Sequence, residues 1–383
     1  MFLRARTSPN FSSRRGGRST LLLAPCLGAL LGWALAGAGC SAGPRAATSA
    51  GSDSVEERRS RAAAGDVEAQ LVLGAQYAEG RGVAADRAEA ARWFALAARA
   101  GDPRGEHALA VLANDPVERA QRLERAASAG HAPAQRGLGL ALLRGEGVAP
   151  DEPQAARWLA LAADAGDAEA RFVLGVLLLE GRGVEPDPVA GVARLQAAAQ
   201  QGFAPAQRAY ARALARGQGG EPDLVAAAGW LRRAAEQGLA EAAADLGLAL
   251  LEGRGVERDA AEGARWLTFA AEQGIASAQS NLALLHLRGA GVPHDDEAAA
   301  RWFALAAERG LASAQARLGA LYESGRGVPR DEARAYAWYT LALERGEEAA
   351  GARRAALAAR LSTERLAAAE ALVRELTLRV APR

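Results

Sequence analysis

The sequence predicts an all-α solenoid built from repeated helix pairs. Glycines that end each copy recur every 36 residues with one shorter interval, at Gly65, Gly101, Gly130, Gly166, Gly202, Gly238, Gly274, Gly310 and Gly346. Seven copies also share a Gly-x-Gly loop and an aspartate after it, and six of these seven have an Ala-Ala pair near the end. A period of this length is typical of proteins in which each unit packs only on its neighbours.

Each copy is expected to contain two helices joined by a tight loop. In the first copy, Ala69, Leu73 and Tyr77 lie four residues apart on one face of a first helix, and a second apolar stripe surrounds Trp93. The loop at residues 80–83 has glycine at its first and third positions. Glycine adopts the left-handed conformation that ends helices at little cost.

An aspartate occupies the expected start of the second helix in every full copy. These residues are Asp86, Asp151, Asp187, Asp223, Asp259, Asp295 and Asp331. A carboxylate at this place accepts hydrogen bonds from the free backbone amides and meets the positive end of the helix dipole. We interpret all seven as N-caps.

A tryptophan recurs at one position of the second helix, followed each time by Phe, Leu or Tyr. The six are Trp93, Trp158, Trp230, Trp266, Trp302 and Trp338. Small residues on the first helix, from Gly74 to Gly319, leave room for a large neighbour, so we expect each indole to wedge over one of them. Stacking of a ligand on an exposed ring is the alternative.

The pattern resembles the Sel-one-like repeat, a relative of the tetratricopeptide repeat. The first copy carries its motif at Ala69-Gln70, Leu73-Gly74, Tyr77, Gly80-Arg81-Gly82-Val83, Asp86, Trp93, Ala97-Ala98 and Gly101, and the resemblance covers about residues 55 to 346. It implies a right-handed superhelical solenoid of antiparallel helix pairs that binds other proteins and has no catalytic residues of its own.

One copy, residues 101–130, departs from the pattern. It is seven residues short, lacks the Gly-x-Gly loop and passes between its helices through Asn114-Asp115-Pro116. Asp115 can still cap, and proline is tolerated at the first position of a helix. We expect a shortened first helix.

Residues 1–40 are typical of a signal peptide. Several arginines precede an uncharged apolar run, Leu21 to Ala38, and small residues lead to Cys40. The run is long enough to span a membrane, but its Gly and Ala content favours a secretory signal. Gly37-Ala38-Gly39-Cys40 resembles the lipobox of bacterial lipoproteins, whose cysteine is lipidated, although Gly37 stands where leucine is usual. Ordinary cleavage near residues 36–38 is the alternative.

The remaining segments are interpreted as a tether and two lids. Residues 41–54 are rich in Ser, Ala and Gly, as in a flexible tether. Ser54 and Glu57 fit a capping box that opens a half repeat. The array covers residues 55–346, and residues 347–383 are expected to form capping helices, with Ser362 capping the last one.

Composition limits the function. The 46 basic residues nearly balance the 45 acidic ones, so nucleic acid is not an expected partner. The two cysteines, Cys26 and Cys40, precede the repeats, and no nucleophile motif is present. His286 and His294 lie near Asp295 and Asp296, but their spacing fits no zinc motif. We expect no enzyme activity, metal or cofactor.

One face of the first helix varies between copies, and in tetratricopeptide relatives this helix lines a concave groove. The candidate partner-binding residues are Arg136, Leu140, Phe172, Val173, Val176, Arg208, Arg212, Asp245, Leu248, Leu284 and Arg317. Apolar residues on an exposed helical face indicate an interaction surface, and a merely solvated face is the alternative. Charges that flank the loops reverse sign between copies, as at Glu180, Arg216 and Glu252, and predict a ladder of exposed ion pairs.

Three function classes follow. The favoured one is a lipid-anchored, monomeric adaptor that binds proteins in the periplasm at the outer membrane, with no membrane contact beyond its lipid. A binder of glycan or peptidoglycan fragments would use Trp and Arg as its platform. An enzyme acting on cell wall would need a cluster of carboxylates or a nucleophile, which the sequence does not offer.

Overall fold

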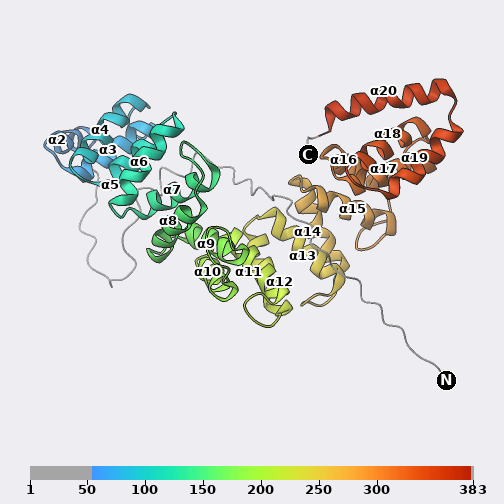
Figure 1. Ribbon diagram of the computed structural model, residues 1–383, viewed down its shortest axis with the longest axis horizontal. Helices are drawn as coiled ribbons and strands as arrows, with labels where there is room; N and C mark the ends of the chain where they lie inside the picture. The colour runs from blue at the N-terminus through green and yellow to red at the C-terminus, as the bar shows by residue number, and fades with distance from the viewer. Residues whose placement is uncertain (1–53, 381–383) are drawn as a thin grey trace. The chain divides into compact units, whose positions relative to one another are not determined.

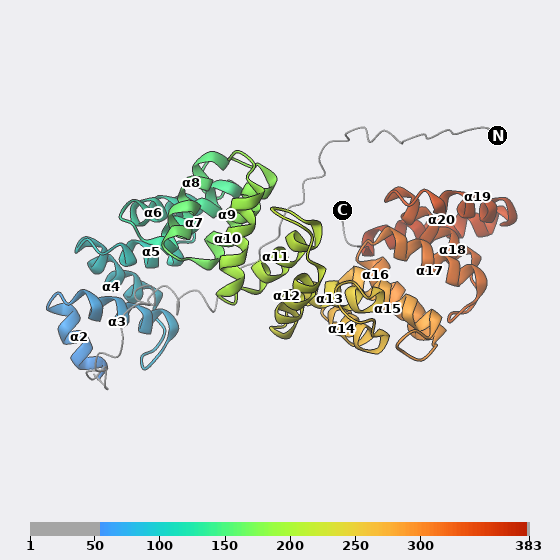
Figure 2. The same ribbon diagram turned by 90° about the horizontal axis from the view of Figure 1, so that it is seen from below.

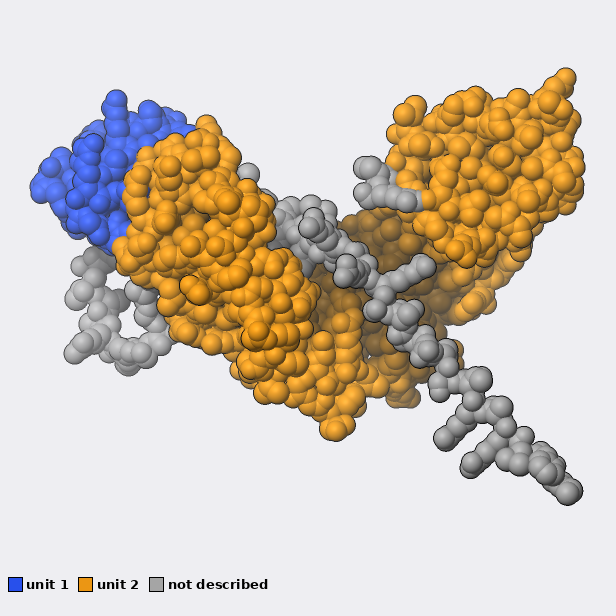
Figure 3. Space-filling model, viewed as in Figure 1, with its two compact units in different colours: residues 1–112 blue, residues 113–383 orange. Residues whose placement is uncertain are grey.

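The computed structural model describes residues 54–380, which divide into two compact units (Figure 3). Unit 1 ends at Leu112 and contains α2 (Val55–Ala63), α3 (Val67–Glu79), α4 (Arg87–Arg99) and α5 (Pro103–Leu112). Unit 2 begins at Ala113 and contains α6 (Pro116–Ser128), α7 (Ala132–Arg144), α8 (Glu152–Asp164), α9 (Ala168–Glu180), α10 (Pro188–Gln200), α11 (Ala204–Arg216), α12 (Leu224–Glu236), α13 (Ala240–Glu252), α14 (Ala260–Glu272), α15 (Ala276–Arg288), α16 (Asp296–Glu308), α17 (Ala312–Ser324), α18 (Glu332–Glu344), α19 (Ala349–Arg360) and α20 (Thr363–Arg379).

Each unit is a stack of helix pairs (Figure 1, Figure 2). In each full copy the first helix packs on the second, and the second helix packs on the first helix of the next copy. No strand occurs between residues 54 and 380, so the expected all-α solenoid is confirmed. The core follows these seams and consists largely of alanine and leucine.

The aspartate caps are present in all seven full copies. Each carboxylate accepts a hydrogen bond from a backbone amide in the first turn of its second helix. In the short copy, Asp115 accepts from the amides of Val117 and Glu118, and Pro116 is the first residue of α6. The cap prediction is confirmed at each position because it depends only on residues within one turn.

The two loop glycines have different structural roles. Gly253 ends α13 with a φ of 70°, as expected of a left-handed cap. Gly255 has a φ of 71°, and a Cβ at this residue would overlap the backbone carbonyl of Leu224, the first residue of α12. The second glycine therefore lets the loop of one copy lie directly on the second helix of the preceding copy.

The small residue of the first helix contacts the residue after the tryptophan. A Cβ at Gly139 would lie 2.7 Å from Cγ of Leu159, and one at Gly247 would lie 2.8 Å from Cγ of Leu267. Both leucines are fully buried. The expectation that the indole fills this space is wrong, because consecutive side chains on a helix point about 100° apart and the second of the pair faces inward.

Buried glutamines link neighbouring copies at the end of the second helix. Gln279 Nε2 donates to the carbonyl of Ala271 at 3.0 Å, and Gln70, Gln135, Gln207 and Gln315 repeat this bond with a carbonyl eight residues earlier. The last carbonyls of a helix have no partner within the helix. Each of these carbonyls accepts from the amide of the glycine that ends its copy, and glutamine in the Ala-Gln motif supplies a second donor from the next copy.

The predicted ladder of loop charges is wrong in its partners. Arg182 contacts Glu180 of its own loop at 3.6 Å, but its closer contact is Glu152 in the preceding copy at 2.6 Å. Arg326 likewise contacts Asp296, the first residue of α16, at 2.6 Å. In the described residues the flanking charges of neighbouring loops do not pair with one another, because each loop lies on a helix start instead.

The short copy lies at the division between the units. Its first helix, α5, has ten residues, whereas the first helices of the other copies have thirteen. The division falls between this helix and α6.

Both ends of the described chain carry helix caps. Ser54 and Glu57 form the reciprocal bonds of a capping box before α2. Ser362 Oγ accepts a hydrogen bond from the amide of Arg365 at the start of α20, and α20 packs on α18.

Burial and a hydrogen bond to Glu323 raise the pKa of Tyr339, on α18, to about 12.

Candidate functional site

The predicted groove residues lie on the first helices of unit 2. Arg136 and Leu140 are on α7, the residues between 172 and 176 are on α9, Arg208 and Arg212 are on α11, Asp245 and Leu248 are on α13, and Leu284 and Arg317 are on α15 and α17. The structure separates them into a buried set, a paired set and an exposed row.

Phe172 and Val173 belong to the core. Their exposed fractions are 6% and 8%, so the expectation that they lie on an open face is wrong. The Phe172 ring meets the ring of Phe203, just before α11, edge to face with centroids 5.6 Å apart. The position of Phe172 faces the start of the first helix of the next copy, which covers an apolar side chain there.

Two other copies carry arginine at the position of Phe172, and these arginines pair with the next copy. Arg136 donates to Asp167, the N-cap of α9, at 2.9 Å, and also contacts Glu169 at 3.4 Å. Arg208 donates to Asp245 on α13 at 2.7 Å. Both arginines are partly buried, so these pairs hold consecutive first helices together as well as contributing charge to the surface.

The remaining candidates include a row of four half-buried residues and one exposed arginine. One position of the first helix carries Leu140, Val176, Arg212, Leu248 and Leu284 in five consecutive copies, and we call these residues the first-helix row. Leu140, Val176 and Leu284 rest against core clusters with part of each side chain open to solvent. The row is apolar except at Arg212. Arg317 lies outside it and is exposed.

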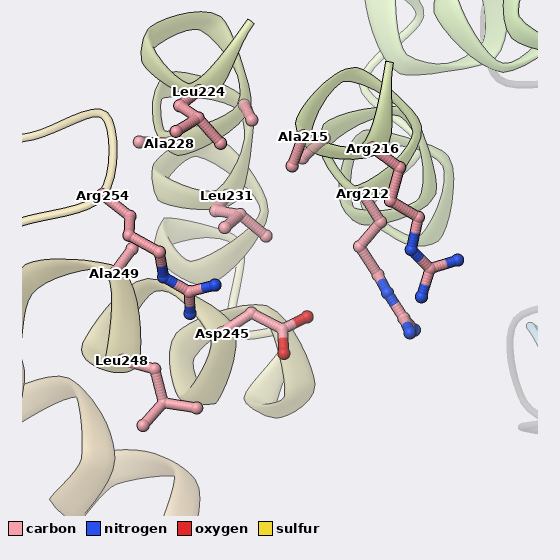
Figure 4. Close-up of a pocket in the computed structure, with 12 residues that line it drawn as sticks. Arg212, Ala215, Arg216, Leu224, Ala228, Leu231, Asp245, Leu248, Ala249 and Arg254 are labelled. Atoms are coloured by element: carbon pink, nitrogen blue, oxygen red, sulfur yellow. The ribbon is translucent and has the colours of Figure 1, made fainter. Parts of the chain in front are cut away.

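A pocket of about 250 Å³ opens around Arg212, between α11, α12 and α13 (Figure 4). Its walls are Ala211, Arg212, Ala215, Arg216, Leu224, Ala227, Ala228, Leu231, Asp245, Leu248, Ala249 and Arg254. The sequence had identified Arg212, Asp245 and Leu248. Leu224 and Leu231 were not predicted because they lie on the second helix α12, and Arg216 and Arg254 flank the loops.

Positive charge is concentrated in the pocket. Partial burial lowers the pKa of Arg212, and the nearby charge of Arg208 lowers it further. Much of the Arg212 surface stays open to solvent, and its guanidinium stays charged. In the described residues, neither Arg212 nor Arg216 has a hydrogen-bond or ion-pair partner.

The tryptophans do not offer a common ligand platform. Trp338 is 5% exposed, and the other five repeat tryptophans are half-buried. At Trp230, the guanidinium of Arg233 lies 4.4 Å from the ring centroid and Tyr210 meets the ring edge to face. These contacts occupy the surface that a stacked sugar would need.

The described residues show no assembled metal site and no membrane-spanning helix. No group of three or more His, Cys, Asp or Glu side chains is placed to hold an ion between residues 54 and 380. His294 contacts Asp296 at 3.3 Å. None of the helices in this range is both long and apolar enough to cross a bilayer. Cys40 lies outside the described residues.

The repeats identify the family. The Sel1 repeat model matches seven segments, residues 67–102, 132–167, 168–203, 204–239, 240–275, 276–311 and 312–347. The chain belongs to the Sel1 repeat family. No curated protein matches it.

Two solved Sel1 repeat structures are similar over most of the chain. A Sel1 repeat protein from Oxalobacter formigenes is 33% identical, with 80% of this chain and 91% of that one covered and a TM-score of 0.61. The c5321 protein of uropathogenic Escherichia coli, described as a protective antigen with an SLR fold, is 29% identical, with 86% and 80% covered and a TM-score of 0.56. Sel1 repeat proteins serve as protein-interaction scaffolds, and the family is generally non-catalytic.

Proposed function

We propose that this Sel1 repeat protein is a non-catalytic scaffold of the bacterial cell envelope that binds partner proteins along the first helices of unit 2. The observation that carries the proposal is the first-helix row, in which one repeat position stays partly open to solvent in five consecutive copies. Leucine and valine at four of these places give a surface whose burial by a partner is favourable.

The paired arginines support the same face as a rigid platform. Arg136 and Arg208 hold consecutive first helices through Asp167 and Asp245, so the row between them is fixed before a partner arrives. A preformed surface loses less conformational entropy on binding.

The proposed location rests on the N-terminal sequence. The basic opening, the apolar run and the resemblance of residues 37–40 to a lipobox support export and lipidation at Cys40. Ser41 follows the cysteine, where aspartate retains many lipoproteins at the inner membrane, so we place the protein in the periplasm at the outer membrane. A tether over residues 41–54 would let the repeats search for partners close to the anchor.

Photocrosslinking in intact cells tests the binding surface. A photoreactive residue at Leu248 should capture a protein partner, whereas one at Leu161, exposed on the second helix α8, should not. Equal capture at the two positions, or none at Leu248, would refute the proposed surface.

Lipid labelling tests the anchor separately. Cells grown with a clickable palmitate analogue should label the protein, and Cys40→Ser should remove the label and release the protein or block its processing. A mature protein without label would leave export possible but remove the lipid from the proposal.

A further inference from the structure

The first-helix row changes chemistry at one copy. Val176 and Leu248, one copy before and one copy after, are apolar, but Arg212 on α11 is charged and borders the pocket between α11, α12 and α13 (Figure 4). An arginine among apolar equivalents disturbs a surface that would otherwise continue uniformly along the repeats.

The charges around this arginine are unbalanced. Asp245, the acidic residue of the pocket wall, accepts a hydrogen bond from Arg208 at 2.7 Å, so this one carboxylate is shared between Arg208 and the charge of Arg212. Arg254 is paired with Glu252 at 2.6 Å. Arg212 and Arg216 lie on the same wall, one helical turn apart, without an acceptor among the described residues. Two adjacent guanidinium groups repel each other, and a bound carboxylate would relieve this repulsion.

The opposite part of the pocket carries three leucines beside Arg254, which pairs with Glu252 (Figure 4). Leu224, Leu231 and Leu248 line it, and Leu224 has an exposed fraction of 42%. Since the pocket volume is about 250 Å³, it admits one or two side chains but not a folded element. Its ligand must therefore combine negative charge with a neighbouring apolar group.

We propose that this pocket binds an acidic segment of a partner protein, with a carboxylate held by Arg212 and Arg216 and an adjacent apolar side chain packed on Leu231 and Leu248. The inference rests on the proposed scaffold function and names the chemistry of one partner contact. Leucine walls favour a peptide over a nucleic acid, which would need stacking or further phosphate contacts.

A defined peptide tests the pocket in the full-length protein. The probe is a fluorescein-labelled peptide in which glutamate and leucine alternate, and fluorescence anisotropy measures its affinity. Matched peptides with glutamine for glutamate, or serine for leucine, should each bind at least about tenfold more weakly, because each lacks one half of the recognition. Raising the salt concentration from about 50 to about 300 mM should weaken the acidic peptide more than the glutamine peptide.

The variants have a matched control. Arg212→Leu restores the residue type of the neighbouring copies, and combined with Arg216→Gln it should weaken the acidic peptide at least about tenfold. Arg288→Gln changes the residue that occupies the Arg216 position two copies later, outside the pocket, and should leave affinity unchanged. Circular dichroism confirms that each variant is folded.

The outcomes separate this inference from the scaffold function. Equal binding of the glutamate and glutamine peptides, or equal effects of the pocket variant and Arg288→Gln, would overturn the pocket. Capture of a partner at Leu248 that is unaffected by the double variant would retain the scaffold and also overturn the pocket. Specific peptide binding without any captured protein would support the pocket and refute the scaffold.

Discussion

The contact between Gly74 and Phe94 predicts a substitution whose effect changes sign with its background. Gly74 is in α3 and Phe94 in α4, and the phenylalanine is 1% exposed. A Cβ at Gly74 would lie 2.6, 2.7 and 3.0 Å from three atoms of the Phe94 ring, which are its three nearest neighbours. The ring is therefore the closest obstacle to a methyl group at this position.

The expected free energies follow from two opposing effects. Alanine favours a helix over glycine by about 1 kcal/mol, whereas forcing an extra methyl into a packed core costs about 1 to 3 kcal/mol. With distances this short and the ring enclosed, Gly74→Ala should destabilise unit 1 by about 1 to 2 kcal/mol. Phe94→Ala should cost about 3 to 5 kcal/mol, and in that background Gly74→Ala should stabilise by about 1 kcal/mol.

Urea unfolding of the four proteins, followed by circular dichroism, measures the cycle, and hydrogen exchange in α3 and α4 localises it. Gly229→Ala is the matched control. Gly229 is also inside a helix, α12, but a Cβ there has no neighbour within 4 Å. This control should stabilise by about 1 kcal/mol. Additive effects of the Gly74 and Phe94 substitutions, or a stabilising Gly74→Ala in the native background, would refute the packing argument.

Further predictions concern the core, a link, a cap and a titration. Phe303→Ala should cost about 3 to 5 kcal/mol in urea unfolding and Trp302→Ala clearly less, because Phe303 is fully buried and Trp302 half-buried; equal costs would contradict this. Gln279→Met should cost about 1 kcal/mol by removing the donor that the next copy supplies to the Ala271 carbonyl, which keeps its bond from the Gly274 amide, and protection from hydrogen exchange at the end of α14 should fall with it. Asp259→Ala should lower stability by about 1 kcal/mol in the same assay, and no change would mean that the cap is dispensable. The pKa of Tyr339 is raised from 10.0 to about 12, so its contribution is full below pH 10 and is lost as pH rises to about 12; Tyr339→Phe should flatten the decline of the urea midpoint in this range.

The sequence by itself determined the features that depend on neighbouring residues. The helix pairs follow from periodicity, the caps at Asp86 and its equivalents follow from residues within one turn, and the first loop glycine follows from the need for a left-handed residue. The family could also be assigned from these motifs, since they recur at fixed spacing.

Only the tertiary structure decided which side of each helix the neighbouring copies cover. It placed Phe172 and Val173 in the core, turned Leu267 instead of Trp266 toward the first helix, and directed Arg182 to the preceding copy. The pocket around Arg212 combines residues from three helices and a loop, so no single periodic face reveals it. Local sequence specifies where helices begin and end, whereas the rotation and spacing of one helix against another depend on all the side chains between them.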